Sequence, residues 1–161
     1  MLGTGLNRRT AISLGLGIGL GVGAPRAMAH NAEASSAQDL FQLYRDLINA
    51  HDFDLLAERV IAPDAVFIFS DRRDQGLEAV RAGFERTWRI IPDEVYRMTD
   101  PVWIIDDPQT AVCTFDYSYS GTTTSGTGLS GGGQGITVLR RRQGQWRLCL
   151  EQLTPDTRRR A

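Results

Sequence analysis

The side chains of this chain that can carry out chemistry are mainly carboxylates, tyrosines and arginines. All 18 basic residues among the 161 are Arg, so no Lys is available for a Schiff base, a pyridoxal-phosphate linkage or a Walker A phosphate loop. His30 and His51 are the two histidines, and a multi-histidine metal site is hard to build from them. We therefore expect no metal and no cofactor.

The two cysteines, Cys113 and Cys149, lie in apolar stretches typical of strands. Their spacing fits no zinc motif. A disulfide between them is compatible with an exported protein, and two buried free thiols are an equal alternative.

The last apolar stretch, residues 145–154, contains two polar candidates, Glu151 and Gln152. Strict alternation along a strand places Gln152 on the same face as Trp146, and Glu151 on the opposite face with Cys149. The sequence leaves open which face is inward. If the Trp146 face is inward, Gln152 is the polar group of a pocket and Glu151 points to solvent or to a dimer partner.

The residues ahead of these strands predict three helices. A capping-box pattern at 36–39 precedes a helix that ends near Ala50, and its apolar positions follow helical spacing. Asp52 can cap a short second helix that stops at Pro63. A third helix runs from Gly76 to Pro92.

The strands predicted from residue 65 onward complete an α+β domain. A short buried strand covers 65–69, and longer strands cover 95–105, 110–119, 136–142 and 145–154, with Pro101 at an edge or bulge. Residues 120–133, rich in Gly, Ser and Thr, predict a loop. Helices followed by an antiparallel meander indicate helices packed on one face of a sheet.

The first 29 residues resemble a twin-arginine export signal. Arg8 and Arg9 precede an apolar, glycine-rich core, and Ala27-Met28-Ala29 fits a cleavage site. An ordinary secretory signal is the alternative. The core is too short to span a membrane, and the mildly acidic remainder is not typical of a nucleic-acid binder. We expect a signal at 1–29, a linker at 30–36, one domain at 37–155, a tail at 156–161, and a periplasmic or secreted location.

The order of several motifs resembles the nuclear transport factor 2-like superfamily, in its SnoaL-like branch. The motifs are Asn49-Ala50-His51-Asp52-Phe53-Asp54, Ala62-Pro63-Asp64-Ala65-Val66-Phe67, Gln75-Gly76-Leu77-Glu78-Ala79-Val80 and Gly144-Gln145-Trp146-Arg147. The resemblance implies a cone-shaped curved antiparallel sheet packed on three N-terminal helices, an apolar pocket and a homodimer. It does not settle function, because members include isomerases, cyclases and association domains.

The acid–base members of that superfamily place a Tyr, an Asp base and a protonated Asp around the substrate. Tyr44 matches the Tyr. The base position falls at the apolar Phe69, so the nearest acid, Asp71, becomes the second catalytic candidate. The place of the other acid falls near Gln134 and Gly135, which cannot donate as an acid.

Two functions follow from this pattern. The first is an exported domain whose pocket binds a small apolar molecule. The resemblance allows isomerase-like or cyclase-like acid–base chemistry in this pocket, but the residues do not establish it. Its expected ligand-binding residues are Phe67, Phe69, Trp88, Trp103, Phe115, Tyr117 and Gln152. The alternative is a non-catalytic dimeric association module. A cavity of ~300 Å³ or more that holds Tyr44 and a carboxylate favours the first function.

Overall fold

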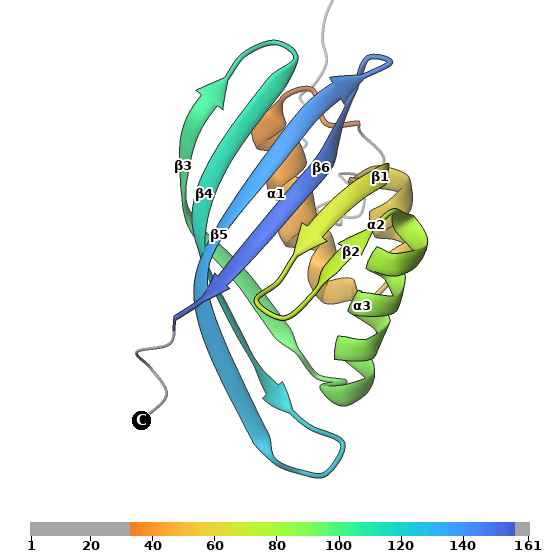
Figure 1. Ribbon diagram of the computed structural model, residues 1–161, viewed down its shortest axis with the longest axis vertical. Helices are drawn as coiled ribbons and strands as arrows, with labels where there is room; N and C mark the ends of the chain where they lie inside the picture. Colours follow the sequence, from red (N-terminus) through yellow and green to blue (C-terminus); the bar gives the residue numbers. More distant parts are fainter. Residues whose placement is uncertain (1–32, 157–161) are drawn as a thin grey trace, which may run out of the picture. The chain divides into compact units, whose positions relative to one another are not determined.

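The helices begin where their capping residues predict. The computed structural model describes residues 33–156 (Figure 1). Ser36 caps α1 (Ala37–Leu47) with a complete capping box through Asp39, and Asp52 caps α2 (Phe53–Arg59) through the Leu55 amide. A short 3₁₀ turn, η2 (Ile48–Ala50), separates them, and α3 (Leu77–Ile90) follows later. The predicted export signal and cleavage site lie outside the described residues.

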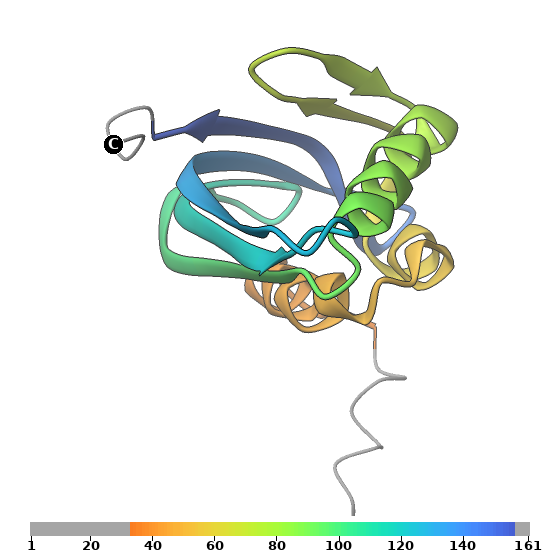
Figure 2. The same ribbon diagram turned by 90° about the horizontal axis from the view of Figure 1, so that it is seen from below.

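Six strands form one curved sheet, with the helices on its concave side (Figures 1 and 2). The strands are β1 (Ile61–Ile68), β2 (Arg73–Gln75), β3 (Val95–Asp106), β4 (Thr110–Thr122), β5 (Gly128–Arg142) and β6 (Gln145–Pro155). Their order across the sheet is β2-β1-β6-β5-β4-β3. The predicted α+β class and curved sheet are confirmed.

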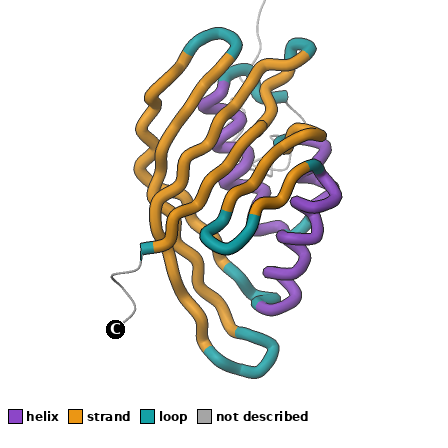
Figure 3. The backbone as a smooth tube through the Cα atoms, viewed as in Figure 1, coloured by secondary structure: helices purple, strands orange, loops and turns teal. Residues whose placement is uncertain are grey.

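The sheet is mixed, whereas the sequence predicted an antiparallel one. β1 runs parallel to β6, and every other neighbouring pair is antiparallel. β1 and β6 are not joined by a hairpin, since α3 and the whole β3–β5 meander lie between them in the chain (Figure 3). Pro101 was expected at an edge or a bulge, and it has both: β3 is an edge strand, and the β3–β4 register shifts between Thr99 and Val102.

The glycine-rich segment is a strand rather than the predicted loop. β4 continues to Thr122 and β5 begins at Gly128, so the turn is confined to 123–127. Three β5 glycines, at 131, 133 and 135, pair with Tyr119, Tyr117 and Phe115 of β4. A Cβ on Gly135 would lie 2.3 Å from the Phe115 ring, and one on Gly131 would lie 2.6 Å from the Tyr119 hydroxyl. The absence of a side chain at 131 and 135 therefore lets aromatic rings of β4 cover β5.

Within residues 33–156, no helix is both long and apolar enough to cross a membrane. No group of three or more His, Cys, Asp or Glu side chains in this range could hold a metal ion. Cys113 is buried, Cys149 is half-buried, and both are free thiols.

Candidate functional site

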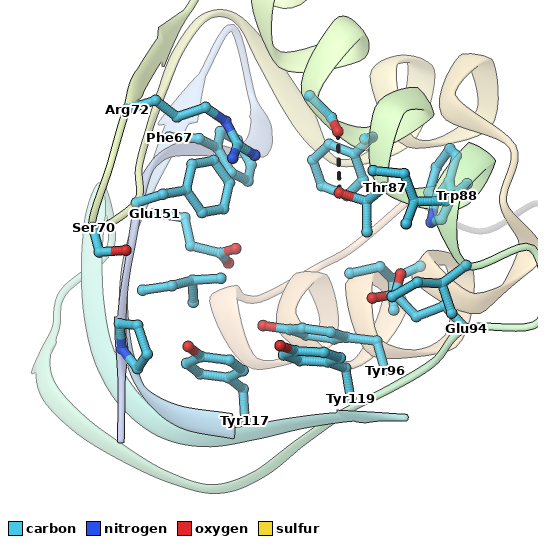
Figure 4. A pocket seen from close by; sticks show the side chains of 18 of the residues that line it. Phe67, Ser70, Arg72, Thr87, Trp88, Glu94, Tyr96, Tyr117, Tyr119 and Glu151 are labelled. Atoms are coloured by element: carbon cyan, nitrogen blue, oxygen red, sulfur yellow. Dashed lines mark hydrogen bonds between the residues drawn. The ribbon is translucent and has the colours of Figure 1, made fainter. Parts of the chain in front are cut away.

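A cavity of about 340 Å³ lies between α3, the concave face of the sheet and the end of α1. Figure 4 shows side chains from β1, β3, β4, β6 and α3 directed into it. Most of its wall is aromatic or aliphatic, and its polar groups come from a few residues. The wall includes Tyr44, Phe67, Phe69, Phe84, Trp88, Tyr96, Tyr117, Tyr119, Glu94, Glu151, Ser70, Asp71 and Arg72.

Glu151 is the central polar group of the cavity. Its side chain leaves β6 and points into the open space (Figure 4), and the residue is only 2% exposed. The Tyr44 hydroxyl donates a hydrogen bond to Oε1 of Glu151 over 3.1 Å. Oε2 is buried and has no hydrogen-bond partner in the described part of the chain. A buried carboxyl oxygen without a partner is costly, so this atom is available to a ligand.

Burial raises the pKa of Glu151 to about 8, because the charged carboxylate loses its hydration in the cavity. The hydrogen bond from Tyr44 acts in the opposite direction and stabilises the charged form. Glu151 is therefore largely protonated at neutral pH and can also release its proton near that pH. Such a value suits a general acid or base.

Tyr96 supplies a second unpartnered polar atom. Its hydroxyl is buried and makes no hydrogen bond among the described residues. The Asn49 side chain holds the Tyr96 backbone on both sides, accepting from its N–H at 2.7 Å and donating to its C=O at 2.9 Å. The ring stacks on Tyr117 with centroids 5.8 Å apart. Burial raises the pKa of Tyr96 well above its usual range, so the hydroxyl is a neutral donor.

The far wall is built from aromatic side chains on α3. Phe84 packs edge-on against Phe67 and against Trp88, with centroids 5.6 Å and 5.4 Å apart. His51, in a left-handed conformation, stacks on Trp88 at 5.0 Å and its Nε2 lies 3.1 Å from the Glu94 carbonyl oxygen. Glu94 also lines the cavity, and burial raises the pKa of its carboxyl.

The structure brings together most, but not all, of the predicted site residues. Tyr44, Asp71, Phe67, Phe69, Trp88 and Tyr117 all line the cavity. Asp71 lies at the rim with its side chain 75% exposed, so it lacks the desolvation of Glu151. Trp103 and Phe115 instead pack around Phe41, with centroids 6.0 Å and 5.4 Å away. Gln152 is exposed and does not line the cavity.

Strict alternation put Glu151 and Trp146 on opposite faces of the strand, but both are buried because β6 carries a β-bulge. Val138 pairs with Leu150 while its neighbour Leu139 pairs with Leu148, which leaves Cys149 as an extra residue. One extra residue inverts the alternation beyond it. Trp146 and Leu148 are thus buried ahead of the bulge, and Glu151 is buried after it. The inward position of Glu151 and the outward position of Gln152 follow from this irregular pairing of β5 with β6, which the sequence does not reveal.

The three helices and the curved sheet agree with the comparison to known protein families. A profile of the SnoaL-like domain matches residues 41–148. The chain belongs to the SnoaL-like family. No curated protein matches the sequence.

Solved structures share this SnoaL-like fold at low sequence identity. A nuclear transport factor 2-like superfamily protein from Salmonella enterica serovar Typhimurium aligns with a TM-score of 0.66 at 15% identity, covering 74% of this chain and 87% of that one. A protein of unknown function from Mycobacterium tuberculosis aligns with a TM-score of 0.63 at 25% identity, covering 74% and 69%. Hexachlorocyclohexane dehydrochlorinase LinA Type2 aligns with a TM-score of 0.66 at 14% identity, covering 75% and 83%.

Proposed function

We propose that the SnoaL-like domain binds a small, largely apolar molecule in this cavity and performs acid–base chemistry on it through Glu151. The observation that carries the proposal is the buried, half-partnered carboxyl of Glu151 at the centre of an aromatic cavity. Ligand pockets are commonly apolar with a few placed polar groups. The volume of about 340 Å³ and the presence of Tyr44 with a carboxylate favour this function over a filled association module.

The chemistry depends on the protonation state of Glu151. In its neutral form, the Oε2–H and the Tyr96 hydroxyl can both donate to one ligand oxygen, such as a carbonyl, and stabilise negative charge that develops there. In its charged form, the same oxygen can accept a proton from a carbon next to an electron-withdrawing group. Tyr44 holds Oε1, so Oε2 is the reacting atom in both cases.

The test is a thermal-stability screen of the wild-type domain against apolar carbonyl compounds and lipids. A ligand present at ~100 times its Kd adds ~2.7 kcal/mol to the free energy of unfolding, which is readily measured. We expect hits with the wild type that weaken or vanish in Glu151→Gln and persist in the control Glu58→Gln, whose side chain is exposed on α2. An absence of hits, or hits unaffected by Glu151→Gln, would contradict the proposal.

We propose in addition that the domain forms a homodimer through the outer face of the sheet, the face away from the helices. One row of directly paired aliphatic residues crosses five strands on this face: Ile105, Val112, Val138, Leu150 and Val66. Ile105 is 43% exposed and nearby Val102 is 61% exposed. The other four residues of the row are half-buried, and an apolar strip that stays partly accessible across a sheet face is a candidate interaction site.

We also propose export to the periplasm or beyond, on the basis of the resemblance of residues 1–29 to a twin-arginine signal. N-terminal sequencing of the protein from the periplasmic fraction should begin at His30. Replacement of Arg8 and Arg9 by lysine should retain the precursor in the cytoplasm. A full-length protein in the cytoplasm of the wild type would overturn this assignment.

A further inference from the structure

Arg72 is a positively charged residue in the wall of the cavity, near the end of β1. It lies in the segment between β1 and β2, beside Ser70 and Asp71, and all three line the cavity. Figure 4 shows its guanidinium directed inward over the aromatic wall. Its side chain is 30% exposed, so it is partly desolvated.

Two contacts hold this guanidinium, and α3 packs beside it. Nε donates to Oδ2 of Asp74 over 3.1 Å, and the Asp74 side chain is only 13% exposed. The guanidinium carbon lies 4.0 Å from the centroid of the Phe69 ring, which is a cation–π contact. On the third side is α3, where a Cβ on Gly83 would lie 2.6 Å from Asp74 Oδ2 and 3.6 Å from Arg72 Nη2.

Gly83 supports a defined position of the Arg72 guanidinium beside α3. It lies inside α3, where glycine costs ~1 kcal/mol of helix stability relative to alanine. The absence of a side chain there lets the helix approach the Arg72–Asp74 pair. The helix thus accommodates a fixed guanidinium at the cavity wall.

The terminal nitrogens of Arg72 remain available. Within residues 33–156 they make no hydrogen bond, and Asp71 Oδ1 lies 3.7 Å from Nη1 with its side chain 75% exposed. An exposed ion pair at that distance contributes little. The Nη1–Nη2 edge has the planar fork geometry that matches a carboxylate.

We propose that Arg72 binds a carboxylate of the ligand, so that the cavity takes an organic acid with a flat apolar body. This inference rests on the proposed function, since another part of the same ligand would carry the oxygen that meets Glu151 and Tyr96. Asp74 acts as a positioning residue that fixes the fork. The aromatic rings of the cavity wall contact the apolar body.

The test uses three fluorescent probes with the same flat body: 6-hydroxy-2-naphthoate, its methyl ester, and 2-naphthol. Fluorescence titrations at pH 6.5 give a Kd for each. We expect the wild type to bind the acid about tenfold more tightly than the ester, as a charge-assisted pair predicts. Arg72→Gln should abolish this preference while it leaves the Kd of 2-naphthol within about twofold.

The matched control is Arg73→Gln, since Arg73 is the next residue on the same hairpin and bonds to Gln75 at the surface. This variant should retain the preference for the acid. If Arg72→Gln fails to fold, the acid and the ester are compared in the wild type at low and high salt. A preference for the acid that depends on charge must shrink as the salt concentration rises.

The outcomes separate the two proposals. Equal binding of acid and ester, or a preference that survives Arg72→Gln, overturns the role of Arg72. If the role of Arg72 is overturned but 2-naphthol binds the wild type and loses affinity in Glu151→Gln, the proposed function stands without a role for Arg72. If no probe binds the wild type, both proposals are contradicted.

Discussion

The Tyr44 hydroxyl donates to Oε1 of Glu151 over 3.1 Å and joins the first helix to the last strand across 107 residues of sequence. Both side chains are buried, Tyr44 at 1% exposure and Glu151 at 2%. The bond fixes one carboxyl oxygen and orients the other toward the cavity. The pair therefore serves the fold and the site at once, and its two roles can be separated by measurement.

The first prediction concerns the pH dependence of stability. Burial raises the pKa of Glu151 from its ordinary 4.5 to about 8, so between these values the folded protein holds a proton that the unfolded chain has released. The protonated Glu151 therefore contributes fully to the free energy of unfolding below pH ~4.5. This contribution is lost as the pH rises to about 8, by at most ~1.4 kcal/mol per pH unit. Urea unfolding from pH 5.5 to 8.5 measures this slope.

Glu151→Gln is the control for that slope. Glutamine keeps an oxygen that can accept from Tyr44 and does not titrate, so the difference in stability between wild type and variant should shift in favour of the variant as the pH rises. Glu94 remains in both proteins, and its own raised pKa cancels in the comparison. A difference that stays constant across this range would mean that Glu151 is not buried as a neutral acid.

The second prediction concerns Tyr44→Phe. Removal of the hydroxyl leaves Glu151 Oε1 without its donor, and an unpaired buried polar atom costs about 1–3 kcal/mol of stability. The same change removes a group that favours the carboxylate, so the pKa of Glu151 should rise further. Carbon NMR of the glutamate carboxyl measures that pKa, and Tyr119→Phe, at the rim of the cavity, should leave it unchanged. An unaltered pKa in Tyr44→Phe would show that the hydroxyl does not stabilise the charged form of Glu151.

The helices were predictable because their signals are local. The Ser36 capping box, the Asp52 cap and the helical spacing of Leu40, Tyr44 and Leu47 depend on residues within one or two turns. The inward position of Tyr44 followed from that spacing. The resemblance to the SnoaL-like branch then gave the curved sheet and the cavity.

The rest of the site depended on pairing between strands, which no local pattern records. The extra residue at Cys149 moved Glu151 inward and Gln152 outward, so an alternation that is correct at Trp146 fails five residues later. The glycines of β5 predict a loop by composition, yet three of them pair with aromatic residues of β4. Both errors arise from tertiary contacts that override local preference.

The third prediction tests the glycine–aromatic pairing. Gly135→Ala places a Cβ 2.3 Å from the Phe115 ring, which is buried among other core residues and cannot move freely. Overpacking of this kind costs about 1–3 kcal/mol. Gly128→Ala is the control, because a Cβ at that position would have nothing within 4 Å, and it should change stability by less than about 0.5 kcal/mol. Equal effects in chemical denaturation would argue against a ring packed on Gly135.

The last prediction concerns the outer face of the sheet. Ile105→Glu places a charge at one end of the aliphatic row that crosses the sheet, where burial of an unpaired carboxylate against a second copy would be strongly unfavourable. We expect the wild type to sediment as a dimer at micromolar concentration and the variant to sediment as a folded monomer. Ile90→Glu is the matched control, since Ile90 is similarly exposed, at 49%, but lies at the end of α3. A wild-type monomer, or dissociation by the Ile90 variant instead, would exclude this face as the dimer interface.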